Sequence, residues 1–155
     1  MVVAVTAGVV TLAIVARVVT LVDDWGRDWT NNHAKWDDSA TDPEMRPMRL
    51  HQPIAEVRQE LETWVESEPI WQLESIADDS VDAPVAVQTQ AIHLTRRTKW
   101  LRFVDDVHVQ LTEEVSSAGE VITRVDAESQ SRVGKGDLGQ NPRNLKHLRE
   151  AFSAE

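Results

Sequence analysis

Two alternating segments in the second half of the chain constrain its fold more than any other feature. In the first, residues 102–111, one face of the predicted strand carries Phe103, Asp105, Val107, Val109 and Leu111. In the second, residues 121–127, apolar and polar residues alternate in the same way, as expected for strands with one buried face. Only a short turn separates the two segments, and such a turn joins antiparallel neighbours. The sequence therefore predicts a β-hairpin.

Weaker patterns on both sides of the hairpin complete the domain. A helix is predicted from Pro53, because apolar residues then recur at spacings of three and four. Residues 70–76 and 85–94 are strand candidates. Asn141 as N-cap and Pro142 at the first helical position open a last helix. The predicted fold class is α+β, with an antiparallel sheet of about four strands and two helices packed on one of its faces.

The first 22 residues form an apolar run in which only Arg17 is charged. About twenty apolar residues suffice to cross a bilayer as a helix. Trp25 and Trp29 follow at once, as an interfacial aromatic belt would. We therefore predict a transmembrane helix, single-pass membrane localisation and the lipid bilayer as a partner. Few basic residues follow the run, so the side on which the domain lies stays open.

Two other interpretations of this run are less favoured. A cleaved signal peptide would have a basic n-region and a small-residue cleavage site, and neither is present. A buried core helix is less favoured because this run is apolar on all sides and too long for so small a domain. The predicted division of the chain is a membrane anchor over residues 1–22, a juxtamembrane linker over 23–52 and the α+β domain over 53–155.

Composition excludes several classes of function. The chain has a formal charge of -10, which argues against a nucleic-acid partner, because nucleic-acid binding needs a basic face. It has no cysteine, so disulfides, thiolate zinc sites and cysteine nucleophiles are excluded together. His33 and His51 lack neighbours at metal-ligand spacing, and we predict no metal and no cofactor. An acid-rich, lysine-poor chain suits a high-salt cytoplasm, so a halophilic source is a hypothesis.

A glycine-rich loop, residues 131–143, connects the hairpin to the last helix. Its glycines, Gly134, Gly136 and Gly139, match the G-x-G-x-x-G spacing of dinucleotide-binding loops. That fingerprint requires a parallel strand–helix–strand unit with an acidic residue about twenty positions later. Only one helix is predicted after this loop. Dinucleotide binding is therefore set aside, and the glycines are assigned to backbone geometry.

Together, the RFVDDV segment at residues 102–107 and this loop resemble the family called domain of unknown function 1499. The likeness covers roughly residues 53–152, and its specific motifs lie in the last third of the chain. The resemblance implies a small α+β domain, often preceded by a signal or membrane segment, without an established activity. Besides Phe103, it carries over the residues that we take as ligand-binding candidates: Arg102, Asp105, Asp106, Ser131, Arg132, Gly134, Asp137, Gly139, Asn141 and Arg143.

Two interpretations of the loop stay open. Backbone amides at a helix N-terminus, with Arg132, Lys135 and Arg143 nearby, could bind a carboxylate, a phosphate or a lipid headgroup. Alternatively, Asp137 or Asp105 already occupies that position, and Arg132 or Arg143 neutralises it. The second is favoured, because Asp105 lies on an apolar face and a buried carboxylate needs a partner.

The function predicted from these features is a membrane-anchored binding or scaffolding module, with a small anionic ligand or a protein as partner. The alternative is a hydrolase-like enzyme whose polar site lies at the loop and the RFVDD strand; its catalytic residues are not assigned. Asp105 and Asp106 should point to opposite faces of the strand, so they are not expected to act as an acid–base pair. Asp106, His108 and His93 share a face and form a weaker candidate for a metal or general-base site.

Overall fold

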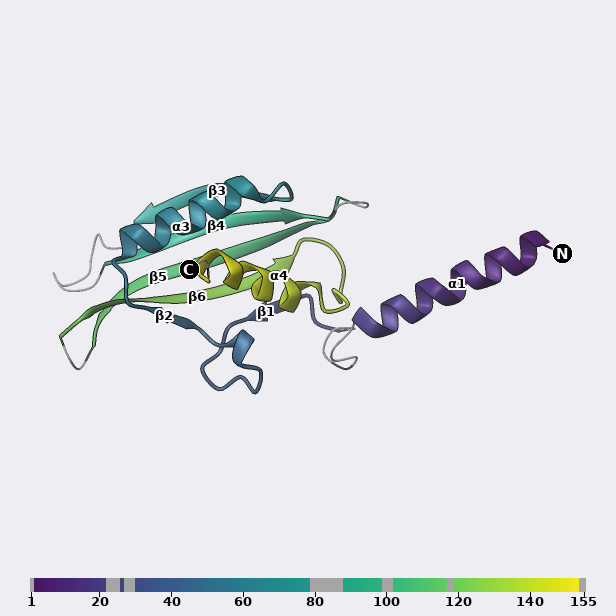
Figure 1. The fold of residues 1–155 in the computed structure, drawn as a ribbon, viewed down its shortest axis with the longest axis horizontal. Coiled ribbons are helices and arrows are strands. Elements are labelled where there is room, and N and C mark those ends of the chain that lie inside the picture. Colours follow the sequence, from purple (N-terminus) through teal and green to yellow (C-terminus); the bar gives the residue numbers. More distant parts are fainter. Residues whose placement is uncertain are drawn as a thin grey trace.

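The structure is a computed structural model that describes residues 2–21, 26, 30–78, 88–98, 102–116 and 119–153. Its elements follow one another along the chain as shown in Figure 1. They are α1 (Val2–Leu21), β1 (His33–Lys35), the 3-10 helix η1 (Pro43–Met45), β2 (Met48–Leu50), α3 (Ile54–Ser67), β3 (Trp71–Asp78), β4 (Thr89–Arg97), β5 (Val104–Val115), β6 (Val121–Ser131), α4 (Gln140–Leu148) and the 3-10 helix η3 (Arg149–Phe152).

The strands form one six-stranded antiparallel sheet in the order β1-β6-β5-β4-β3, with β2 also paired to β6. The predicted hairpin is confirmed as β5 and β6, whose register runs from Asp105 opposite Ser131 to Val115 opposite Val121. Strand β4 pairs with the other edge of β5, and a β-bulge interrupts its pairing with β3. Both β5 and β6 are therefore held on two sides.

Helices α3 and α4 lie on the same face of the sheet (Figure 1). The alternation of the strands delivers their apolar side chains to that face, where Val107, Val109 and Leu111 of β5 are fully buried. They pack in one core with side chains from the two helices, among them Leu61 and Leu148. The opposite face of the sheet carries mainly polar side chains, as is usual when one face of an antiparallel sheet is not covered.

The prediction of about four strands is wrong, because β1 and β2 also belong to the sheet. Both strands come from the segment predicted to be a linker. Each has only three residues, which is too short to show a period of two. They pair with β6 through its backbone, and Ala34 and Trp36 enter the core beside it. Pairing with an existing strand, rather than their own pattern, makes these residues extended.

The transmembrane prediction is also wrong. Among the residues that the structure describes, no helix is both long enough and apolar enough to cross a membrane. The prediction of single-pass membrane localisation depended on that span and is wrong as well. The bilayer as a partner stays a prediction. Trp25 and Trp29, the predicted aromatic belt, lie outside the described residues.

Candidate functional site

The glycine-rich loop ends in a helix start that differs from the predicted one. Gly139, not Asn141, is the N-cap of α4, and its φ of 75° lies in the left-handed region that favours glycine. The carboxylate of Asp137 accepts hydrogen bonds from the backbone N–H of Gly139 (2.9 Å) and of Asn141 (2.7 Å). These are amides that the first turn of a helix leaves without partners, so Asp137 both caps α4 and complements its dipole.

Because Asn141 does not cap the helix, its side chain is available to the interior. The Asn141 amide group is buried, donates to the carbonyl oxygen of Asn32 (2.6 Å) and accepts from the hydroxyl of Ser129 (2.7 Å). One turn later, Asn144 donates to Ser129 Oγ (3.1 Å) and accepts from Gln140 Nε2 (2.7 Å). Two asparagines at this spacing thus turn one face of α4 into a polar contact with β6.

Asp105 is the charged member of this cluster. Its side chain is only 2% exposed. It accepts a hydrogen bond from Ser131 Oγ (2.7 Å) on one oxygen and from Asn144 Nδ2 (2.9 Å) on the other. We call Asp105, Ser129, Ser131, Asn141 and Asn144 the polar clasp, because together they tie α4 to β5 and β6.

An arginine also meets Asp105, as the sequence predicts, but it is neither Arg132 nor Arg143. Arg96 of β4 lies with its guanidinium 3.8 Å from Asp105 Oδ2, and its side chain is 17% exposed. Its Nη1 is buried without a hydrogen-bond partner among the described residues. Burial lowers the pKa of Arg96; the negative charge of Asp105 opposes that shift, and the positive charge of Arg143 adds to it. The clasp therefore contains a partly compensated buried charge pair.

Asp106 points to the other face of the sheet. Its carboxylate accepts two hydrogen bonds, both of 2.7 Å, from Nε and Nη2 of Arg132, and His93 Nε2 lies 2.8 Å from it. The hydrogen bonds from Arg132, followed by that from His93, hold the pKa of Asp106 at about 2. The rings of His93 and His108 stack at 4.6 Å. Within the described residues, no group of three or more potential ligands is arranged to hold a metal ion.

A cleft of about 360 Å³ opens between the glycine-rich loop and the start of β5. Its mouth carries three apolar side chains that remain exposed, Phe103, Val133 and Leu138. Its polar lining includes Asp105 and Arg143. The lining residues are Thr98, Phe103, Val104, Asp105, Ser131, Val133, Gly134, Gly136, Asp137, Leu138, Gln140 and Arg143.

The structure thus divides the candidates from the sequence into four groups. The candidates that line the cleft are Asp105, Ser131, Gly134, Asp137 and Arg143. Arg102 precedes Phe103 but does not line the cleft, and its left-handed φ of 54° is unusual for a residue other than glycine. Gly139 and Asn141 form the start of α4, while Asp106 and Arg132 pair on the opposite face of the sheet. The candidates therefore do not converge on one point.

Sequence reasoning missed four participants, Arg96, Ser129, Asn144 and Asn32. The signal for two of them was present. Asn144 falls on the same helical face as Leu145 and Leu148, and Ser129 continues the buried alternation of β6 after Ala127. A polar residue at a buried position usually has a hydrogen-bond partner, so both positions could have been assigned to a polar network.

The family comparison agrees with the motifs. The model of the family described as Protein of unknown function (DUF1499) matches residues 27–152. The chain belongs to the DUF1499 family. The matched region begins before β1, so it includes the two short strands as well as the loop and α4. No curated protein matches the chain. Family membership therefore identifies the DUF1499 domain without assigning it a chemistry.

Proposed function

We propose that this DUF1499 domain is a binding module that takes a small amphipathic anion in the cleft beside the glycine-rich loop. The observation that carries the proposal is the composition of the cleft, which has an apolar mouth and a polar floor. Binding sites for small molecules usually combine a mostly apolar lining with a few polar groups that fix the orientation of the ligand. The cleft volume of about 360 Å³ lies within the usual range of such sites.

The apolar mouth supports a ligand with a hydrocarbon part. Phe103 is 49% exposed, Val133 is 66% exposed and Leu138 is 37% exposed, although all three line one cleft. Single exposed apolar residues are ordinary on a protein surface, but a contiguous set at the mouth of a cleft is typical of a binding site. Covering these side chains with an apolar group would remove them from water and favour binding.

The charges around the floor support an anionic head. Arg143 lines the cleft, and its positive charge is felt at the buried guanidinium of Arg96. The two carboxylates of the cleft, Asp105 and Asp137, already accept hydrogen bonds from the clasp and from the start of α4. The chain as a whole has 26 acidic and 16 basic residues, whereas at this place two arginines balance two carboxylates.

Two alternatives from the sequence have less support. An anion at the N-terminus of α4 would compete with Asp137 for the amides of Gly139 and Asn141, and Arg132 is engaged by Asp106. An enzyme would need a base that reaches its substrate, whereas Asp105 is buried and accepts hydrogen bonds on both oxygens. Binding in the cleft leaves the hydrogen bonds of Asp137 and Asp105 in place.

The proposal is tested with 1-anilinonaphthalene-8-sulfonate, an anionic apolar dye that fluoresces when it binds. We expect decanoate to displace the dye and decyltrimethylammonium, which has a similar chain and a cationic head, to displace it poorly. Arg143→Gln should weaken dye binding about tenfold, since a hydrogen bond to a charged group is worth about 1.5–3 kcal/mol. Arg49→Gln is the matched control, because Arg49 pairs with Asp38 and Glu114 and does not line the cleft.

A second variant keeps the test independent of folding. Val133 is 66% exposed, so Val133→Glu places a negative charge at the mouth without disturbing the core, and it should also weaken dye binding. Equal displacement by the two decyl compounds would contradict the anionic head. Equal losses in Arg143→Gln and Arg49→Gln would contradict the site itself.

A further inference from the structure

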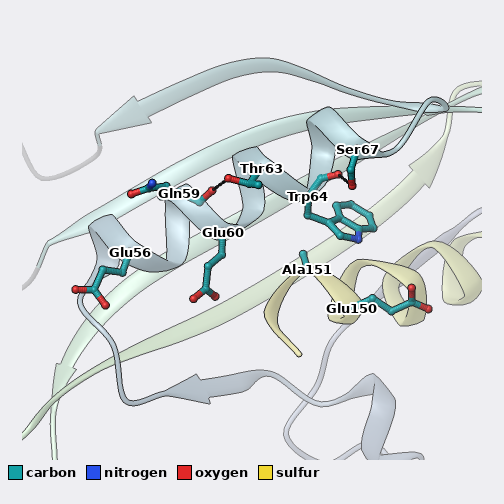
Figure 2. A pocket seen from close by; sticks show the side chains of 8 residues that line it. All are labelled: Glu56, Gln59, Glu60, Thr63, Trp64, Ser67, Glu150 and Ala151. Atoms are coloured by element: carbon teal, nitrogen blue, oxygen red, sulfur yellow. Dashed lines mark hydrogen bonds between the residues drawn. The ribbon is translucent and has the colours of Figure 1, made fainter. Parts of the chain in front are cut away.

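A second groove lies between α3 and η3, and it shares no lining residue with the cleft at the loop. It has a volume of about 510 Å³. Figure 2 shows Glu60 and Trp64 directed from α3 toward the segment that carries Ala151, with Glu150 on that opposite side. Two residue rows of α3, each spaced by four positions, form one wall of this groove.

The floor of the groove is aromatic and held in place. The ring of Trp64 packs edge-on against Trp71 at 5.1 Å and against His147 at 5.2 Å. Ala151, beside it, is small and buried, which leaves space above the indole. The hydroxyl of Thr63 donates to a carbonyl of its own helix (2.8 Å), so a partner does not have to supply an acceptor for it. The groove therefore offers a fixed apolar surface to an incoming side chain.

The rim of the groove is acidic. Its charged residues are Glu56, Glu60 and Glu150, and no basic residue lines it. Within the described residues Glu56 has no ion pair, Glu60 accepts a hydrogen bond from the neutral amide of Gln52 (2.6 Å), and Glu150, which is 69% exposed, lies 3.7 Å from His147 Nε2. Like charges four positions apart destabilise a helix by a few tenths of a kcal/mol. This face of α3 therefore carries a repulsion that a cation from outside would relieve.

The other side of α3 shows the contrast. There Arg58 lies 3.5 Å from Glu62, four positions later, which is the stabilising arrangement of opposite charges. Glu56 and Glu60, which have no ion pair, thus lie on the side of the helix where Trp64 is partly exposed. Acidic groups around an aromatic anchor are complementary to a partner that presents basic and apolar side chains together.

We infer that this groove binds a basic amphipathic segment of a partner protein. An apolar side chain of that segment lies on Trp64 and Ala151, and its lysines or arginines face Glu56, Glu60 and Glu150. The two acidic positions of α3 and its tryptophan extend over more than two helical turns, or about 12 Å, which matches a peptide better than a small cation. This is the helix-in-groove mode of recognition, with the charges selecting the partner.

The test uses a fluorescein-labelled 14-residue peptide of leucine and lysine at helical spacing, with binding followed by fluorescence anisotropy at about 0.15 M salt. Glu60→Gln should weaken binding about threefold to tenfold. Glu66→Gln is the matched control: it removes the same charge from an exposed position of α3 that does not line the groove, and it should leave binding unchanged.

A third variant places a competing cation in the groove. Thr63 is exposed, so Thr63→Lys should fold normally and should abolish peptide binding. Equal losses in Glu60→Gln and Glu66→Gln would overturn the inference, because they would indicate general attraction to a chain with a charge of -10. Equal binding of a lysine–serine peptide with the same charge would overturn the apolar contact.

Discussion

Removing the carboxylate of Asp105 should destabilise the domain strongly. In Asp105→Ala the hydroxyl of Ser131 loses its acceptor, whereas Asn144 keeps the hydroxyl of Ser129 at 3.1 Å. The larger effect falls on Arg96, whose buried guanidinium loses the opposite charge 3.8 Å away. Breaking a buried pair by removing one partner costs about 3–5 kcal/mol. Because Arg96 retains some exposure, we expect the lower end, about 3 kcal/mol.

The assay is urea unfolding followed by tryptophan fluorescence. With a slope of about 2 kcal/mol per molar, a loss of about 3 kcal/mol lowers the midpoint by about 1.5 M. The double variant Asp105→Ala with Arg96→Met removes both charges and should recover about 1–2 kcal/mol, so the double-mutant cycle should show coupling of that size. A loss below about 1 kcal/mol in Asp105→Ala, or additive effects in the cycle, would refute the view that the clasp holds a buried charge pair.

Three further predictions concern single contacts. Asp106→Asn should cost about 1 kcal/mol of stability at pH 7 after solvent screening. The folded-state pKa of Asp106, about 2, lies below its unfolded value, so this stabilisation is present above about pH 4 and is lost as the pH falls toward 2. A difference in thermal stability between the two proteins that stays constant across this pH range would contradict the prediction. Gly139→Ala should cost about 1–2 kcal/mol because of the left-handed φ of 75°, and an unchanged melting temperature would contradict this. Thr123→Val should cost about 1 kcal/mol in urea, since the buried hydroxyl donates to the carbonyl of Gln52 (2.7 Å), and no loss would mean that water replaces it.

The central hairpin was predictable because its signal is local. Apolar and polar residues alternate through β5 and β6, and the turn between them is short, so register and facing follow from the pattern. The same alternation predicted that Asp105 lies at the edge of the core or beneath it and needs a partner; the structure buries Asp105 and places Arg96 3.8 Å away. It also separated Asp105 from Asp106, which the structure places on opposite faces of the sheet.

The clasp was less predictable because tertiary contacts decide it. Asn141 has the composition of an N-cap, but Ser129 and Asn32 engage its side chain and Asp137 takes over the capping. The strands β1 and β2 have no periodic signal, since pairing with β6 makes them extended. Arg96 lies on β4, and the sequence pattern of β4 does not predict that this side chain meets Asp105 of β5.

The predicted membrane span failed for another reason. The prediction counted a run of about twenty apolar residues as a span, which requires a helix that is both long enough and apolar enough. Within the described residues no helix meets both requirements.

The most direct test of the binding role is an amide NMR titration of the ¹⁵N-labelled chain with decanoate. If the cleft beside the glycine-rich loop is the site, shift changes should concentrate at residues 103–105 and 133–143 and should vanish in Val133→Glu. The dissociation constant from the titration should equal the one from dye displacement. Shift changes spread over the surface, centred on α3, or unaltered by Val133→Glu would contradict the proposed site.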